Sequence, residues 1–485
     1  MNKTGQDQGS LHPEFLYRFR STHALLEGYE ELERQEIFFA APEELNDPLE
    51  GFTNIVWQGD AILWRNLLRH YLLCLLEAAF SALVLGAEFK PETYTPRVRM
   101  TDEDLPEAPI RDMYAEICRT FQEHDATRLF IAEADRLGLK LGREGLAGYL
   151  RLLQPLAIGT MFRVLAENGL PIDKSNKNLI TAPPELLNHM CAMLEAHAKL
   201  GADAEILLAI GEKAGGELAL IDDYNCDRRP GLASLYFLYR DFPRAYIDHL
   251  GELMFPGWYT ACFVEAPANA AMWGVYGDSH RGACLQFRTA KSKEGKRTLP
   301  LSGSFSSSIG AASSRTSNFE LAFESVRYAE DYPEIDFFTM LGTLSRTKLD
   351  KFWYAGDEGK RSVKAERILS EDAEWRCEYW ASHANANTTK LPHWAHEAEQ
   401  RLVLTGMLDD RLDLASRKLR YRADNLAGIV FGMKTSHADK LAIMRVIDSK
   451  LSPEQRRHFT FYQARFACET KRLEHVPLRL LSPKS

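Results

Sequence analysis

The spacing of apolar residues changes twice along the chain. Near the start it predicts a strand at Phe15–Arg20, a helix through Glu33 and a second strand at Ile37–Ala40. Over residues 59–250 apolar residues recur every three or four positions, which is the spacing of one helix face. Strand-like runs then return at Tyr259–Val264, Ala283–Phe287, Val326–Tyr328, Arg401–Leu404 and Ile429–Phe431. The pattern therefore predicts an α+β core interrupted by a large all-helical insertion.

The same pattern divides the chain into segments. In chain order these are the first part of the core, the helical insertion, the second part of the core and a C-terminal helical segment, at residues 1–58, 59–250, 251–435 and 436–485. The last segment is expected to hold helices over 437–451 and 453–468, because its apolar residues recur at helical spacing. Residues 301–317 are rich in Ser and Gly and contain few residues that could pack, which predicts a mobile loop.

Composition and charge narrow the classes of protein to consider. Hydrophobic residues make up 45% of the chain and charged residues 26%, as in ordinary soluble domains. The net charge of −9 argues against a surface that coats nucleic acid. The basic stretch Arg417–Arg422 leaves a local contact with phosphates open, beside its simpler interpretation as a solvated face. The apolar run Tyr71–Ala87 contains Glu77 and is shorter than the roughly 20 residues of a membrane span, so we expect a buried helix.

Cysteine spacing and the N-terminal residues bear on location. The eight cysteines include no Cys-x-x-Cys pair, so reduced thiols are expected rather than a zinc or redox site. Residues 1–12 are polar and lack the basic start and apolar stretch of a secretory signal. We therefore expect a cytoplasmic protein without a membrane partner.

Four short motifs follow one another along the chain. They are Leu16–Arg20 with Phe38–Pro42 and Asn46–Pro48, then Met272–Gly282, then Lys390–Arg401, and finally Gly428–Gly432. Together they resemble the bacterial family called domain of unknown function 2971. That family's pattern is a Tyr-x-Tyr/Phe-Arg strand, an Asn-Asp-Pro turn, a Trp-x2-Tyr-x3-His-x-Gly segment and a Trp-x2-Glu-x-Glu-x-Arg strand. The resemblance implies a related core fold, and it does not extend over the helical block. It does not imply any particular activity.

The third motif holds the most reactive side chains. If Glu397–Leu404 is a strand, its two-residue period places Glu397, Glu399 and Arg401 on one face. Two neighbouring acids raise the pKa of one carboxyl group and an adjacent arginine lowers it. Such a face therefore suits proton transfer or the stabilisation of a developing cation. A solvated salt-bridge ladder is the simpler interpretation, and the residues alone leave both open.

This Glu-x-Glu pattern also resembles the corresponding strand of ADP-ribosyltransferases. The resemblance implies a split β-sheet core and NAD as the substrate. Glu399 would stabilise the oxocarbenium-like centre, Glu397 would orient the acceptor, and Tyr276 would take part in catalysis by packing on the nicotinamide. The residues that would bind NAD are Arg18, Arg20, Tyr276 and His280, with the two arginines as alternatives for the phosphates or ribose.

Three functional hypotheses remain open. The leading one is an NAD-dependent ADP-ribosyltransferase-like effector in phage defence or toxicity, with a nucleic-acid or protein acceptor and a protein trigger bound by residues 59–250. The second is a non-catalytic recognition protein that binds protein or nucleic acid through that helical block. The third is a nuclease or phosphohydrolase in which Glu397, Glu399 and Asp278 hold Mg²⁺. Outside this third hypothesis no metal site is predicted.

Overall fold

The computed structural model describes residues 15–170, 183–225, 233–305, 315–370, 373–406 and 413–479. The chain forms two compact units, each built from separate stretches of sequence. The first unit combines Met1–Phe52, Gly257–Tyr332 and Ala384–Ser485, and the second combines Thr53–Pro256 and Pro333–His383. The helical insertion therefore also takes in Pro333–His383, which the apolar pattern had placed in the core.

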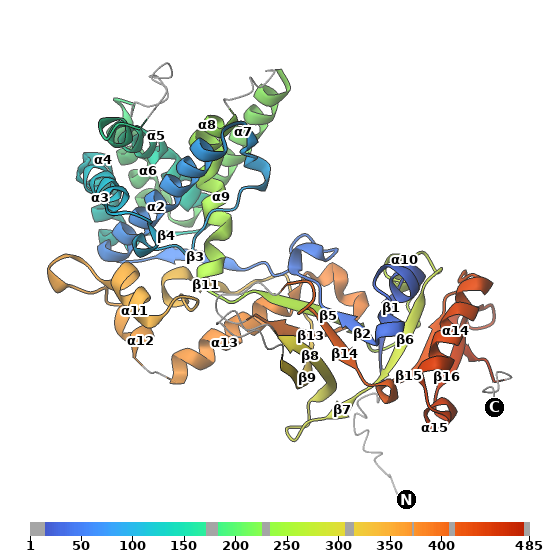
Figure 1. Cartoon of the computed structure of the whole chain (residues 1–485). Helices are drawn as coiled ribbons and strands as arrows, with labels where there is room; N and C mark the ends of the chain where they lie inside the picture. Colours follow the sequence, from blue (N-terminus) through green and yellow to red (C-terminus); the bar gives the residue numbers. More distant parts are fainter. Residues whose placement is uncertain are drawn as a thin grey trace, which may run out of the picture. The chain divides into compact units, whose positions relative to one another are not determined.

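The first unit is built on a large mixed sheet (Figure 1). Its strand order is β17-β16-β15-β6-β1-β5-β13-β9-β8-β14-β2, with β7 paired to β8. At the centre, β1 (Phe15–Arg20) pairs antiparallel with β5 (Trp258–Val264) and β6 (Ala283–Arg288), and β5 pairs in turn with β13 (Glu399–Thr405). The other strands of this sheet are β2 (Glu36–Phe38), β7 (Ala290–Lys291), β8 (Arg297–Phe305), β9 (Arg315–Ser325), β14 (Lys418–Tyr421), β15 (Leu426–Phe431), β16 (Thr460–Ala467) and β17 (Arg472–Pro477).

Alternation along these strands sends apolar side chains to two separate clusters. Leu16 on β1 packs with the larger cluster, which α14 (His437–Lys450) completes through Ile443 and Ile447. Phe19 packs with the smaller cluster, around the buried Trp273 of α10 (Ala270–Val275). Both faces of the central strands are covered by packed side chains. A polar side chain on one of these strands is therefore held in a fixed position by its neighbours.

The second unit is mostly helical, as the apolar spacing predicts. Its longer helices are α2 (Ala61–Leu85), α3 (Ala108–Glu123), α4 (Asp125–Arg136), α5 (Arg143–Glu167), α6 (Leu186–Leu200), α7 (Ala202–Asn225) and α9 (Phe242–His249). A small sheet joins β3 (Asn54–Gln58), β4 (Lys140–Leu141) and β11 (Glu334–Asp336). Asp60 begins α2 because its carboxylate accepts hydrogen bonds from the backbone of Ile62 and Leu63.

Helix α2 contains the apolar run that we expected to be a buried helix. The segment Ala61–Glu88 is long and apolar enough to cross a membrane, yet 56% of its most apolar window is buried inside the protein. Tyr71, Cys74 and Leu75 are fully buried in the core of this unit. The apolar character of α2 thus agrees with a core helix.

Two predictions about local structure are wrong. Residues 301–305 and 315–317 lie in the paired strands β8 and β9, and not in a mobile loop, while residues 306–314 fall outside the described residues. The expected helix over 453–468 is replaced by the short α15 (Pro453–Arg457) and by β16, which pairs parallel with β15. In β16 the buried Phe461 aligns with Ile429 of β15, so pairing with an existing sheet outweighs the helical spacing.

Candidate functional site

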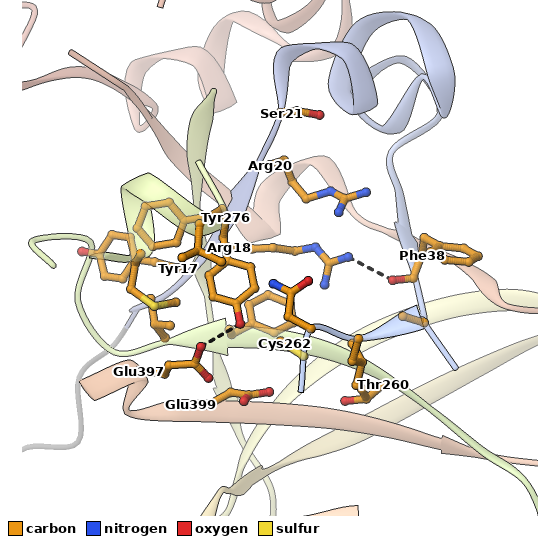
Figure 2. Close-up of a pocket in the computed structure, with 18 of the residues that line it drawn as sticks. Tyr17, Arg18, Arg20, Ser21, Phe38, Thr260, Cys262, Tyr276, Glu397 and Glu399 are labelled. Carbon is orange, nitrogen blue, oxygen red and sulfur yellow. Dashed lines mark hydrogen bonds between the residues drawn. The ribbon is translucent and has the colours of Figure 1, made fainter. Parts of the chain in front are cut away.

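The first unit contains a cavity of about 450 Å³, within the size range of small-molecule sites. Its walls include the side chains of Arg18, Arg20, Tyr276, Glu397 and Glu399 (Figure 2). These residues come from β1, from the residue that follows α10, from the short helix that precedes β13 and from the beginning of β13, so segments far apart in sequence meet here.

Sheet register explains why the two ends of the chain meet at this cavity. β5 lies between β1 and β13, and its residue Val264 is paired with Tyr17 on one side and with Glu399 on the other. Arg18 and Glu399 therefore lie on strands that flank the same end of β5. The structure thus brings together the arginine, tyrosine and glutamates that the motifs single out.

Arg18 is buried, and no acidic side chain in the described part of the chain forms an ion pair with it. Its Nη2 donates a 2.9 Å hydrogen bond to the carbonyl oxygen of Phe38, and its guanidinium carbon lies 5.6 Å from the centroid of the Phe263 ring. Its Nε has no hydrogen-bond partner among the described residues. Burial, reinforced by the nearby positive charge of Arg20, lowers the pKa of Arg18 to about 10. An anion in the cavity would supply the missing partner.

Arg20 is engaged differently, which separates the two alternatives left open by the sequence. Its Nε donates to Glu31 at 2.8 Å, and a second bond from Nη2 to the same carboxylate makes the pair bidentate. Glu31 belongs to α1 (Glu31–Arg34) and is itself buried. Because this carboxylate already neutralises Arg20, Arg18 is the better anion-binding candidate.

Five buried charged residues form an ionic cluster at the other end of the cavity: Glu50, Lys390, Glu397, Glu399 and Arg401. Lys390 Nζ lies 2.6 Å from Glu399 and 2.9 Å from Glu397. Arg401 Nη1 donates to Glu50 at 2.6 Å. Side-chain exposure is at most 6% for every member, so these charges compensate one another with little help from water.

The pKa shifts reflect this mutual compensation. Burial by itself would raise the pKa of Glu399, but the positive charges of Arg401 and Lys390 outweigh it and lower that pKa to about 2. Burial would likewise lower the pKa of Lys390, whereas the surrounding carboxylates, Glu399 first, raise it. Glu399 is therefore a permanent anion and Lys390 a permanent cation at neutral pH.

The two glutamates of the Glu-x-Glu motif differ in their remaining capacity to bind. Glu399 accepts from Nε and Nη2 of Arg401 at 2.8 and 3.2 Å, from Lys390 at 2.6 Å and from the thiol of Cys262. A carboxylate offers about four acceptor positions, so these donors saturate Glu399. Glu397 accepts only from Tyr276 and Lys390 among the described residues, which leaves positions open for a ligand.

The predicted strand over Glu397–Leu404 begins later than expected. Glu397 ends a 3-10 helix (Pro392–Glu397), and Ala398 adopts the left-handed conformation with φ of 44° before β13 begins at Glu399. Glu397 therefore does not share a strand face with Glu399 and Arg401. The two carboxylates lie close together because both form ion pairs with Lys390 of β12 (Thr389–Lys390).

Tyr276 points into the cavity and bonds to the glutamate that retains free acceptor positions. Its hydroxyl donates a 2.7 Å hydrogen bond to Oε1 of Glu397, which Figure 2 shows as a dashed line. Burial and this hydrogen bond raise the pKa of Tyr276, so the phenol keeps its proton. Trp273, three residues earlier, is fully buried and packs edge-on against Phe19 of β1.

The segment after Tyr276 has an unusual backbone. Asp278, Ser279 and His280 all have positive φ, at 50°, 52° and 70°, a conformation that disfavours residues with a side chain. An added Cβ on Gly282 would lie 2.3 Å from the backbone oxygen of Arg20, so this glycine permits the close approach to β1. The turn directs Asp278 to the cavity wall.

His280 does not reach the cavity, so its proposed NAD-binding role is not supported. Its ring stacks on Trp273 at 6.2 Å between centroids, and it is not among the cavity-lining residues. Burial and the neighbouring charge of Lys434 lower its pKa. These contacts favour a structural histidine in the turn.

The three arginines of the basic stretch Arg417–Arg422 pair with nearby acids, while Lys418 lies over the ring of Tyr29. Arg417 pairs with Glu44 and lies between the rings of Phe38 and Tyr259, at 4.7 and 4.8 Å from their centroids. Arg420 pairs with Glu36 and Arg422 with Asp424. The structure therefore does not support binding of nucleic-acid phosphates by these arginines.

Two residues of the site escaped the sequence analysis. Glu50 follows the Asn-Asp-Pro turn but belongs to none of the four motifs. It lies roughly 340 residues before the other members of the ionic cluster, so the sequence does not indicate that it joins them. Lys390 opens the third motif, where only the acids had been given roles. Within the described residues no group of three His, Cys, Asp or Glu side chains is arranged to hold a metal ion.

Comparison with known proteins supports the family resemblance. Residues 272–402 match the family described as a protein of unknown function, DUF2971. The match includes Tyr276, Lys390 and both glutamates, and it begins after Arg18 and Glu50. No curated protein and no solved structure matches the chain.

Proposed function

We propose that the first unit is an NAD-consuming transferase that resembles ADP-ribosyltransferases in its split β-sheet core and in its reaction. The observation that carries the proposal is one cavity with a buried arginine, Arg18, whose Nε has no partner among the described residues, and a carboxylate with free acceptor positions, Glu397. NAD combines a doubly anionic diphosphate with a ribose whose bond to nicotinamide is broken in the reaction. The cavity offers a cation for the first and a carboxylate for the second.

Arg18 binds the diphosphate in this proposal. A buried guanidinium with open donors gains strongly from a phosphate oxygen, because a charge-assisted hydrogen bond replaces an uncompensated charge. Arg20, held by Glu31, positions the strand and adds positive potential. The two arginines thus have different tasks, which the sequence could not assign.

The reaction breaks the bond between ribose C1 and the nicotinamide nitrogen. Nicotinamide leaves as a neutral molecule with the bonding electron pair, and positive charge develops on the ribose. The acceptor's nucleophilic atom then forms the new bond to C1 and releases its proton. Glu397 stabilises the positive charge in the transition state, and Tyr276 orients Glu397 through their hydrogen bond.

Glu399 has a supporting part in the proposed mechanism. Because Arg401, Lys390 and Cys262 saturate it, Glu399 fixes Lys390, and Lys390 in turn fixes Glu397. The role that the resemblance gave to Glu399 therefore passes to Glu397. The same Lys390 ammonium lies between the two carboxylates where the nuclease hypothesis requires Mg²⁺, so the geometry favours the NAD hypothesis over the nuclease.

We extend the proposal to a cytoplasmic effector of phage defence or toxicity, in which the helical unit receives a trigger and the acceptor is a nucleic acid or a protein. The recognition-protein hypothesis is the alternative. It predicts binding of a partner without NAD turnover.

The test is nicotinamide release from NAD by purified full-length protein, with nucleic-acid and protein acceptors and with a thermal melt of each variant. We expect Glu397→Gln to lose turnover about a hundredfold or more with a melting temperature near that of the wild type. Glu399→Gln, its matched control, should lower the melting temperature because it unbalances the ionic cluster. Wild-type turnover in Glu397→Gln would refute the mechanism, and wild-type protein that neither binds nor cleaves NAD would favour the recognition protein.

A further inference from the structure

The proposed reaction leaves one role unfilled, because the proton that the acceptor releases must pass to a base. The cavity is lined by four carboxylates, those of Glu44, Asp278, Glu397 and Glu399. Three of them already accept hydrogen bonds from cations, Glu44 from Arg417 and the two glutamates of the Glu-x-Glu motif from Lys390. The carboxylate of Asp278 forms no hydrogen bond or ion pair within the described part of the chain, and Asp278 is exposed. It is therefore the cavity carboxylate that is most free to take a proton.

Asp278 has an unfavourable backbone conformation. It is the first of three consecutive residues with positive φ, and its own φ is 50°. Glycine adopts this conformation without strain, whereas aspartate does so chiefly where its short side chain can bond to the nearby backbone. The Asp278 side chain makes no such bond among the described residues, so its carboxylate does not stabilise the turn. A strained residue at the wall of a cavity is a candidate for a functional role.

Backbone hydrogen bonds fix the turn that carries Asp278. The amide of Gly282 donates to the carbonyl oxygen of Gly277 at 2.8 Å, and the amide of His280 donates to that of Trp273 at 3.0 Å. Trp273 is itself fully buried. The backbone at Asp278 is therefore held in place, which suits a group that must meet a reacting atom at hydrogen-bond distance.

We propose that Asp278 is the general base of the transferase reaction, a role that rests on the proposed function. Its carboxylate removes the proton from the acceptor's nucleophilic atom as that atom forms its bond to ribose C1. Nicotinamide has taken the electron pair of the broken bond, and the proton on Asp278 then passes to solvent. An anionic acceptor would need no base. The acceptor group is therefore a hydroxyl or an N–H that must lose a proton, and not a carboxylate.

Two small acceptors test this role with NAD and the purified full-length protein. Methanol must lose a proton to form the methyl glycoside of ADP-ribose, whereas azide ion forms its bond to C1 without losing one. With methanol we expect Asp278→Asn to lower the rate of glycoside formation about a hundredfold or more, the usual effect of removing a general base. With azide the same variant should react at nearly the wild-type rate, and calorimetry should show unchanged NAD binding.

The neighbouring residue supplies a matched control. Ser279 also has positive φ and is exposed, yet it is not among the cavity-lining residues, so Ser279→Asn should leave both rates unchanged. Asp278→Gly relieves the backbone strain, so it should lose the methanol reaction without lowering the melting temperature.

The possible failures are distinguishable. Equal losses with methanol and azide in Asp278→Asn, or a wild-type rate with methanol, would overturn the role of Asp278 and leave the proposed function standing. A wild type that cleaves NAD in neither mixture would overturn the proposed function, and the role of Asp278 with it.

Discussion

Buried charges at the two ends of the cavity differ in their partners: those of the ionic cluster form ion pairs, whereas Arg18 does not do so among the described residues. In the ionic cluster, three carboxylates and two cations lie 2.6 to 3.6 Å apart, and each carboxylate is within ion-pair distance of a cation, although Oε2 of Glu50 has no hydrogen-bond partner among the described residues. Arg18, at the other end, has one carbonyl oxygen and an unpaired Nε. Ion pairs within the cluster offset the desolvation of its charges and hold its members in place, whereas a buried charge without an ion-pair partner remains available to a ligand. The comparison therefore assigns anion binding to the Arg18 end, and at the cluster end it leaves Glu397 as the member with open acceptor positions.

The largest expected effect comes from breaking the compensated end. Arg401→Met removes one of the two cations of the ionic cluster, so that Lys390 alone faces Glu50, Glu397 and Glu399. We expect a loss of about 3–5 kcal/mol in the free energy of unfolding, measured with urea. Arg34→Met, which removes an exposed and solvent-screened pair with Glu30, should leave the free energy of unfolding nearly unchanged. Equal losses in the two variants would contradict the distinction between buried and exposed pairs.

Lowering the pH should weaken the same end more gradually. The pKa of Glu399 is about 2 in the folded protein and 4.5 without its neighbours, so the unfolded chain binds this proton more tightly. The stability that Glu399 contributes is therefore complete above pH 4.5 and is lost as the pH falls toward 2. Urea unfolding across this range should show a steeper fall for the wild type than for Glu399→Gln. Parallel profiles would contradict the assignment.

At the Arg18 end of the cavity, a substitution should weaken ligand binding without lowering the stability of the fold. Arg18→Gln removes a buried charge without an acidic partner, so we expect the free energy of unfolding to stay within about 1 kcal/mol of the wild type or to rise. Binding of NAD or inorganic pyrophosphate, measured by calorimetry, should weaken about tenfold or more. A destabilisation as large as that of Arg401→Met, with unchanged binding, would reverse the roles of the two ends.

Strands and helices with a strong apolar period were predictable from the sequence. The period of two in Phe15–Arg20 marks β1 at its observed bounds, and the spacing over residues 59–250 predicts a mainly helical unit. The late strand β16 was missed because its apolar residues also fit a helix. Only the neighbouring β15 decides between the two, and a contact between distant segments leaves no local signal.

The sequence predicted which residues line the candidate site better than it predicted what each of them does. Arg18, Tyr276 and both glutamates stood out through motifs, and all of them line the cavity. Their division of labour depends on Lys390, Arg401 and Glu50, whose contacts arise only after the sheet has formed. The left-handed Ala398, which separates Glu397 from the strand, is likewise invisible in a pattern of alternating residues.

The pairing of β1 with strands encoded far downstream has a consequence during synthesis. Arg18 and Glu399 are separated by roughly 380 residues, which a ribosome adds in about 20–80 s at roughly 5–20 residues per second. Throughout that interval the nascent chain carries the arginine end of the cavity without the carboxylates. If the proposed reaction takes place, chains that end before β13 lack Glu399, which fixes Lys390, and we expect them to have no transferase activity.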